Sequence, residues 1–459
     1  MADPFLLNHL VSPLFFDLGG RLAPISIRDQ MVRARMAVDR AIEEGLIGPQ
    51  RPLLAIGAGA AGATAAIHSA ACGVPAVLIE AATAPFLRQA GCRTRWIDPV
   101  QYDWPLDHWL RGQYPWTGPT MPLRWASGPA NQIALGWALA LQQSGRRYRH
   151  LQAWFSTRVL GRPLLVRNML RVILGGRGKI VVGAYGMILS CVGAGTEQST
   201  HGNYTGFDFW STDPFQQLSP GDRVLISGGG DGALQDYLRV ATQLRAAREI
   251  YSSLQSSIPR GMEHQLQSAE DQAGRAYVWG TGAPHDHGAL ELLHNLHAAI
   301  VNRLLPGPGV NQPVPGLPGI LATMTAKMPD EITLMYPCSH FSRCYGLNRF
   351  LVLLLAAYLW RYRRKETLMA GSSLHDVVGV SHQCAKSAKA CHRQDHEIVL
   401  ALAPDCRSTP PRQKVLTATL PGRYNVVIVR HGINVSPPLF AGNRQIAQPR
   451  QMLPYYVAP

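Results

Sequence analysis

The sequence predicts an α/β fold with two successive nucleotide-binding units, and three observations lead to this prediction. An apolar run at 53–57 leads into glycines and then into a helix-compatible stretch of small residues. The same strand–glycine–helix pattern returns at 222–247. Two later segments, 185–193 and 424–432, each begin with Tyr, continue as an apolar strand and reach a glycine at the same offset. Two copies of one nucleotide-binding plan produce such an internal repeat.

The first glycine-rich turn, 57–62, reads Gly-Ala-Gly-Ala-Ala-Gly. In such a turn Gly57 permits the tight bend, and Gly59 lets the backbone approach a pyrophosphate. Gly62 lets the helix pack closely against the strand. The turn therefore predicts a dinucleotide site, and a glycine-rich turn without a ligand is the alternative.

Two further features of this region support the same prediction. The helix begins near Ala60 and Ala61, where unpaired N–H groups and the helix dipole favour a phosphate. Glu80 ends a second apolar strand, 77–80, where a carboxylate can accept hydrogen bonds from ribose hydroxyls.

The second glycine-rich turn, 228–233, reads Gly-Gly-Gly-Asp-Gly-Ala. Gly228 and Gly230 take the first two glycine positions, and Ala233 takes the third. A turn without a ligand is a stronger alternative here, because no acidic or basic residue stands at the expected place after the next strand.

These motifs resemble those of the flavoproteins with two dinucleotide-binding domains, the group of thioredoxin reductases and flavin-dependent monooxygenases. The similar parts are GAGAAG with Glu80, the strand LSCVGAG that contains Gly193, and GGGDGALQD. The last is similar to the GGGDSA segment at which those enzymes bind NADPH. The resemblance implies FAD at the first turn and NADPH or NADH at the second. Together these segments span roughly 53–345.

The chain departs from that family at two places. The family usually has a basic pair after the strand that follows its NADPH turn, whereas this sequence has Tyr336-Pro337-Cys338. Arg343 and Arg349 are the nearest substitutes, so the choice between NADPH and NADH stays open. The chain has no CxxC pair, so a disulfide relay of the thioredoxin-reductase kind is not expected.

The predicted fold is thus an FAD-type Rossmann-like domain with a nested second dinucleotide-binding domain and an N-terminal helical segment. The expected boundaries are 1–50 for the helical segment, 51–214 for the first domain, completed by part of 400–459, and 215–430 for the second domain, with an insertion at about 250–320.

An aromatic stretch after Glu80 is the candidate for the substrate or flavin side. Trp96, Tyr102 and Trp104 can stack on a planar ring, and Arg95 can hold a carboxylate or phosphate. Flavin monooxygenases, which this stretch loosely resembles, have an aromatic-rich loop beside the flavin. Packing of these aromatic residues as core is an equal alternative.

No metal site is expected, although histidines gather at 285, 287, 294 and 297. His294 and His297 lie one helical turn apart, but no cysteine or carboxylate set completes a site in the surrounding sequence.

Composition limits the class of protein. The formal charge of +15 favours anionic partners, but the basic residues are scattered, so nucleic acid is not expected as a partner. Eight cysteines in 459 residues indicate thiols in a reducing compartment. The longest apolar run, 350–360, is too short to span a bilayer and predicts a buried helix that includes Trp360. We therefore expect a cytoplasmic protein, with homo-oligomerisation as an option.

The function expected from these features is an FAD-dependent oxidoreductase or monooxygenase that acts on a small molecule, with NADPH or NADH as hydride donor. No catalytic residue can be named. One alternative is a protein that binds FAD or NAD as a sensor and catalyses little. A flavin-dependent RNA modifier is a third hypothesis, based only on the net charge.

Overall fold

The computed structural model describes most residues of the chain. They are 3–19, 26–102, 104–105, 121–176, 178–243, 245–276, 283–307, 312–380, 395–402, 416–435 and 439–440.

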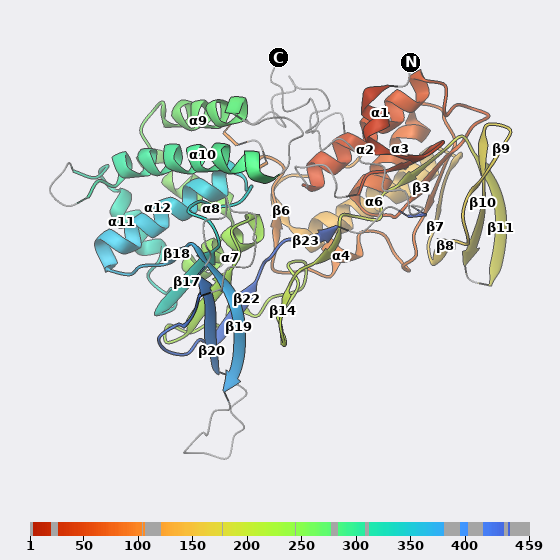
Figure 1. The fold of residues 1–459 in the computed structure, drawn as a ribbon. Coiled ribbons are helices and arrows are strands. Elements are labelled where there is room, and N and C mark those ends of the chain that lie inside the picture. Colours follow the sequence, from red (N-terminus) through yellow and green to blue (C-terminus); the bar gives the residue numbers. More distant parts are fainter. Residues whose placement is uncertain are drawn as a thin grey trace. The chain divides into compact units, whose positions relative to one another are not determined.

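The chain forms two compact units (Figure 1). The first unit comprises Met1–Tyr102, His108–Thr196 and Ile433–Pro459, and the second comprises Asp103–Asp107 and Glu197–Gly432. Each unit contains one of the two glycine-rich turns.

The first unit has a six-stranded sheet in the order β1-β2-β12-β3-β4-β7. All neighbours from β2 to β7 are parallel, and only β1 is antiparallel to β2. Its strands are β1 Leu10–Ser12, β2 Phe15–Asp17, β12 Met187–Ser190, β3 Leu53–Ile56, β4 Ala76–Ile79 and β7 Leu151–Trp154. Every residue of the central strand β3 is buried, as its uninterrupted apolar sequence predicts for a parallel strand covered on both faces.

Helices expected in the N-terminal segment are present as α1 (Pro4–His9) and α2 (Ile27–Glu43). The same segment also supplies β1 and β2, which the sequence did not predict. β2 joins the sheet by pairing with β12, and its side chains, Phe15 and Phe16 among them, are buried there.

Small side chains bring the helices of the first unit close together. α2 packs against α3 (Ala60–Ala71), most of whose residues are alanine or glycine. The remaining elements are α4 Leu87–Ala90, β5 Trp96–Ile97, β6 Gly128–Pro129 and α6 Ala130–Arg147.

A separate antiparallel sheet follows in the chain. β8 (Thr157–Val159), β9 (Leu164–Val166), β10 (Met169–Gly176) and β11 (Lys179–Tyr185) form it. The next apolar run becomes β12 and returns to the parallel sheet.

The second unit has a four-stranded parallel sheet in the order β18-β17-β16-β22. Its strands are β16 Arg223–Ser227, β17 Glu331–Tyr336, β18 Leu368–Ala370 and β22 Val426–Val429. A separate antiparallel sheet contains β19 Ser372–Val380, β20 Asp395–Leu402 and β21 Leu416–Thr419. A short ladder of this unit pairs β14 Thr200–His201 with β15 Tyr204–Thr205. Another ladder pairs β13 Gly195–Glu197 with β23 Ile433–Val435, which belongs to the first unit.

The described residues of 250–320, the segment expected to be an insertion, are largely helical. The helices of the second unit are α7 Asp231–Ala241, α8 Ala247–Leu254, α9 Met262–Ala276, α10 Ala283–Leu304, α11 Leu317–Met324 and α12 Gly346–Arg363, with 3-10 turns at Phe215–Gln217 and Gln255–Ser257. α9 and α10 lie side by side, and α10 also packs on α12 (Figure 1).

α12 contains the apolar run 350–360 and is buried over most of its length. Trp360, the last residue of this apolar run, was expected to be buried. This expectation was wrong, because the residue is 55% exposed. It lies near the end of the helix, where the buried face gives way to the basic residues Arg361 and Arg363.

The fold class predicted from the sequence is confirmed. Each unit contains a parallel sheet in which a buried strand leads through a glycine-rich turn into a helix, the Rossmann-like arrangement.

Candidate nucleotide-binding sites

The first glycine-rich turn joins the carboxyl end of β3 to the start of α3. Gly57 has a φ of +100°, and a β-carbon there would lie 2.7 Å from the Cys191 carbonyl oxygen, just beyond β12. A β-carbon on Gly62 would collide with the Gly57 carbonyl oxygen. Glycine is therefore required at both positions, one for the bend and one for close helix–strand packing.

Gly59 differs from these two glycines because nothing lies within 4 Å of the position of its absent β-carbon. It has a φ of −79°, and no side chain caps α3 at this residue. The amides of Ala60 and Ala61 follow at the start of the helix, whose first turn carries no acidic residue. An uncapped helix terminus beside open backbone is suited to a diphosphate.

Glu80 lies directly after β4 and reaches this turn. Its Oε2 accepts a hydrogen bond from the Ala58 amide at 2.7 Å, and its Oε1 accepts one from the Ala82 amide at 2.8 Å. The carboxylate is thereby held beside the turn, as a ribose-binding acid requires.

Gly193 is the remaining residue predicted for the first site. It follows β12, whereas Glu80 follows β4 on the opposite side of β3. Gly193 has a φ of +92° and, like Gly59, has nothing within 4 Å of the position of its absent β-carbon. Cys191, two residues earlier, donates its amide to the Ile56 carbonyl at 2.7 Å. The first unit thus brings together all the residues predicted for the first site.

The second glycine-rich turn repeats this construction between β16 and α7. Gly228 has a φ of +142°, and a β-carbon there would collide with the Arg430 carbonyl oxygen just beyond β22. The Arg430 amide donates to the Ser227 carbonyl at 2.8 Å, as the Cys191 amide does to Ile56. Gly432 has a φ of +94°, matching Gly193. The internal repeat read from the sequence is therefore a repeat of structure.

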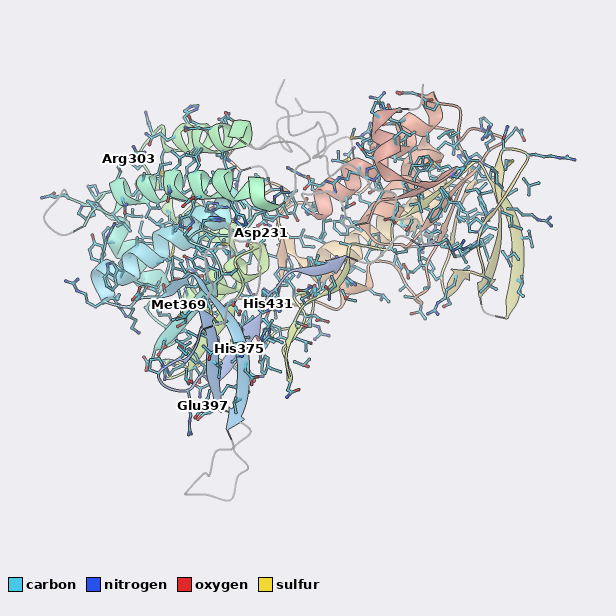
Figure 2. All side chains as sticks on the ribbon, viewed as in Figure 1. Asp231, Arg303, Met369, His375, Glu397 and His431 are labelled. Carbon is cyan, nitrogen blue, oxygen red and sulfur yellow. The ribbon has the colours of Figure 1, made fainter. Side chains whose placement is uncertain are left out.

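The start of α7 differs from the start of α3 in carrying an acid. Asp231 follows the N-cap Gly230 and is labelled in Figure 2. Its Oδ1 accepts hydrogen bonds from the Tyr345 amide and the Asn348 side chain, both at 2.8 Å. Burial raises the pKa of Asp231 to about 7, although these two hydrogen bonds and the Arg349 charge oppose the shift.

Ala233 occupies the third position of the second turn and is fully buried in the core of the unit. Gly230 is open by comparison: the nearest atom to a β-carbon there would be the Arg343 carbonyl oxygen, 3.9 Å away. Gly229 is more crowded, because the loop after β17 lies against it. The Ser342 amide donates to the Gly229 carbonyl at 2.8 Å.

Arg430 belongs to a buried charged network beside α7. Its Nε donates to Asp236 Oδ2 at 2.9 Å, and its Nη1 donates to the Phe207 carbonyl at 2.6 Å. Its guanidinium also lies over the Phe207 ring, 4.7 Å from the centroid. This network could not be predicted from the sequence, because Arg430 and Asp236 are 194 residues apart.

The substitutes considered for the missing basic pair take different positions. Arg349 is fully buried in α12, and its Nη2 donates to the Ser342 carbonyl at 3.1 Å. Arg343 lies on the loop beside Gly230. Its carbonyl oxygen is the atom nearest to the position of the absent Gly230 β-carbon.

The aromatic stretch after Glu80 is not brought together as one cluster. Trp104 packs in the core of the second unit, against Tyr251 and Phe350 at ring-centroid distances of 5.0 and 5.8 Å. Trp104 therefore packs as a core residue, which is the alternative considered for this aromatic stretch. Tyr102 is buried in the first unit, under the Arg28 guanidinium at 5.5 Å.

Arg95 and Trp96 are adjacent but differ in exposure. Arg95 is 1% exposed, whereas Trp96, in β5, is 38% exposed. Of the four predicted residues, Trp96 alone presents a large aromatic surface to solvent.

The histidines of α10 whose side chains the structure describes have different surroundings. His297 lies 3.1 Å from Glu270 through its Nε2, and the His294 ring lies edge-on to Phe341. His287 instead lies beside two residues of the loop after β17, Cys338 and His340. The sequence alone does not indicate this group, because His287 lies about 50 residues before Cys338 and His340. His285 lies where the structure describes no side chain.

Each of the two units has a Rossmann-like arrangement, and solved structures of reductases and monooxygenases are similar to the chain. The Lactococcus lactis thioredoxin reductase is 9% identical, with a TM-score of 0.38 over 83% of this chain and 78% of that chain. The Staphylococcus aureus bacillithiol disulfide reductase is 10% identical, with a TM-score of 0.40 over 86% and 80%.

A third similar structure is the FAD-bound cadaverine monooxygenase of the desferrioxamine biosynthetic pathway from Erwinia amylovora. It is 11% identical, with a TM-score of 0.41 over 85% of this chain and 80% of that chain. These identities are low, and the similarity is one of fold alone. No protein-family model and no curated protein sequence matches the chain.

Within the described residues, no helix has both the length and the apolar character needed to cross a bilayer.

Proposed function

We propose that this protein is an FAD-dependent oxidoreductase whose first unit binds the ADP part of FAD. The observation that carries the proposal is the turn at 57–62, which has an open backbone at Gly59 and the Glu80 carboxylate bound to the Ala58 amide. The amides of this turn would hold the diphosphate, and Glu80 would accept hydrogen bonds from the adenosine ribose.

The bound flavin would supply the hydride transfer, which is chemistry that a cofactor carries. The chain's own residues would bind and orient it. Trp96 is the proposed stacking residue for a planar ring, since it is the exposed member of the aromatic stretch. Arg95, beside it, is the proposed positioning residue, since its side chain is buried and its backbone carbonyl accepts a hydrogen bond from the Ala130 amide at 2.8 Å.

We further propose that the second unit binds NADPH or NADH at Gly228, Gly230 and Ala233. The repeat of turn geometry supports this proposal. The buried Asp231 and the loop against Gly229 favour a second candidate function, in which the protein binds nucleotide weakly and acts as a sensor. The substrate would be a small molecule, and the cytoplasm is the proposed compartment.

Reconstitution with FAD followed by anaerobic titration with NADH and with NADPH tests these proposals in order. A flavin spectrum after removal of excess FAD supports the first proposal, and bleaching by either nicotinamide supports the second. Colourless protein after reconstitution would overturn the oxidoreductase. A stable flavin spectrum that neither nicotinamide bleaches would favour the sensor.

Two matched variants distinguish the proposed role of the first unit from that of the second. Gly230→Ala adds a methyl group where the nearest atom is 3.9 Å away, and Gly59→Ala adds one in open space, so both should fold. Gly230→Ala should slow flavin reduction and leave FAD bound, whereas Gly59→Ala should release FAD.

A further inference from the structure

Three potential metal ligands meet where the start of α10 faces the loop after β17. His287, Cys338 and His340 each offer one ligand atom, and these atoms all lie within 4.8 Å of one another. His287 Nδ1 and His340 Nε2 are 3.3 Å apart. Two Zn–N bonds of about 2.0–2.1 Å at a tetrahedral angle span about 3.4 Å, so the nitrogens already have the required separation.

The ring of His340 is oriented as a metal ligand's ring should be. Its Nδ1 donates to the Phe341 carbonyl oxygen at 2.9 Å, which leaves the lone pair on Nε2, the atom that faces His287. Metal-binding histidines commonly use their second nitrogen in this way, which fixes the tautomer and the ring orientation. His340 is 4% exposed, so the ring is held in place by its surroundings.

The elements that carry the three side chains are packed together. The His294 ring, two turns along α10 from His287, lies 5.0 Å from the Phe341 ring in an edge-on contact. Phe341 in turn contacts Tyr336 at the end of β17, at 4.9 Å. The loop is therefore fixed against both the helix and the sheet, and the ligand positions follow from packed structure.

Charged side chains of both signs lie near this group: Arg349 in α12, and Glu291, one helical turn beyond His287. A thiolate at Cys338 would add a second negative charge. Two neutral imidazoles with one thiolate are a ligand set suited to Zn²⁺.

We propose that His287 Nδ1, His340 Nε2 and Cys338 Sγ bind one Zn²⁺ ion. Binding forms the Zn–S bond as the thiol releases its proton to solvent, and the two imidazoles coordinate as neutral ligands. The fourth position is left to water. The ion joins the start of α10 to the loop after β17, and this site is independent of the FAD and NAD(P)H proposals.

Cobalt titration of the untagged full-length chain tests the site directly. After chelator treatment and removal of the chelator, Co²⁺ should bind with one equivalent per chain. It should show the visible bands of a tetrahedral ion and a thiolate-to-cobalt charge-transfer band, and Zn²⁺ should displace it. Cys338→Ser should abolish the charge-transfer band, and His340→Gln should weaken Zn²⁺ binding at least about 100-fold, since even outer-shell changes cost 10- to 100-fold.

The controls use cysteines outside the group. Cys344→Ser removes a thiol from the same loop, and Cys72→Ser removes the thiol of the surface group Asp39, His68 and Cys72. Both variants should keep the charge-transfer band. His287→Gln, a change near the start of α10, provides a second test of the ligand set if Cys338→Ser fails to fold.

Three results would overturn the proposal. The first is the absence of stoichiometric cobalt binding to the wild-type chain. The second is an unchanged charge-transfer band in folded Cys338→Ser, or unchanged Zn²⁺ affinity in His287→Gln where the serine variant does not fold. The third is loss of the band with Cys72→Ser, which would place the ion at the surface group.

Discussion

The Ala58 amide and the Glu80 carboxylate are joined by a hydrogen bond of 2.7 Å, which links the first glycine-rich turn to the end of the neighbouring strand. The second carboxylate oxygen of Glu80 accepts from the Ala82 amide at 2.8 Å. Both oxygens are thus oriented by backbone, and the remaining lone pairs are left for a ribose.

Glu80→Gln tests this arrangement. Only one of the two terminal atoms of glutamine accepts a hydrogen bond, so one backbone amide loses its acceptor, and the negative charge is lost as well. Hydrogen bonds to charged groups contribute about 1.5–3 kcal/mol, so FAD affinity should fall about 10- to 100-fold. Glu43→Gln, a change at the exposed end of α2, is the control for calorimetric titration with FAD. Equal affinity in Glu80→Gln and the wild type would contradict the assigned role.

Gly62→Ala should destabilise the first unit. Its β-carbon would collide with the Gly57 carbonyl oxygen, so the helix must move away from the strand. Overpacking of this kind costs about 1–3 kcal/mol in the free energy of unfolding. Gly136→Ala in α6, where nothing lies within 4 Å, should leave the free energy unchanged or raise it slightly. Urea unfolding compares the two variants, and equal midpoints would argue against close packing at Gly62.

Asp231→Asn should alter how stability depends on pH. The pKa of Asp231 is raised in the folded protein to about 7 from an ordinary value of 3.8, because burial disfavours the charged form. Its contribution to stability is complete below pH 4, and it is lost as the pH rises from about 4 to 7. Over that window the folded state holds a proton that the unfolded chain has released, so this group lowers the free energy of unfolding with a limiting slope of about 1.4 kcal/mol per pH unit.

Denaturation of Asp231→Asn at pH 4.5 and pH 7.5 measures this contribution. The variant should lose less stability than the wild type between the two values, because asparagine can still accept both hydrogen bonds and does not ionise. Asp271→Asn, at an exposed position of α9, is the control and should behave as the wild type does. An identical pH dependence in wild type and Asp231→Asn would show that Asp231 ionises normally.

Arg430→Met should strongly destabilise the second unit. The change leaves the fully buried Asp236 carboxylate without its 2.9 Å partner, and breaking a buried pair typically costs about 3–5 kcal/mol. Arg423→Gln breaks an exposed pair with Glu397 at 3.8 Å and should cost less than about 1 kcal/mol. Similar thermal unfolding of the two variants would mean that Asp236 finds another partner.

The sequence predicted the parts of the fold that depend on local chemistry. Glycine is required where backbone approaches backbone, as at Gly57 and Gly228, so the two turns and their repeat could be read directly. Strands β3 and β16 were equally clear, because a parallel strand buried on both faces is continuously apolar.

Features that depend on distant contacts could not be predicted in the same way. β2 is a strand because it pairs with β12, far along the chain, and its three residues give no periodicity. Trp104 is core because Tyr251 and Phe350 surround it. The pair of Arg430 and Asp236 could not be predicted either, because the two residues are nearly 200 positions apart in sequence.

Titration of the purified chain with FAD, in parallel with Gly59→Ala and Gly145→Ala, tests the central claim most directly. Both substitutions add a methyl group where nothing lies within 4 Å, but only Gly59 faces the proposed diphosphate position. The wild type and Gly145→Ala should bind one FAD per chain, and Gly59→Ala should bind at least about tenfold more weakly because the methyl group blocks close approach of the backbone to the diphosphate. A wild-type chain that takes up no FAD, or a Gly59→Ala chain that binds it equally well, would contradict the account.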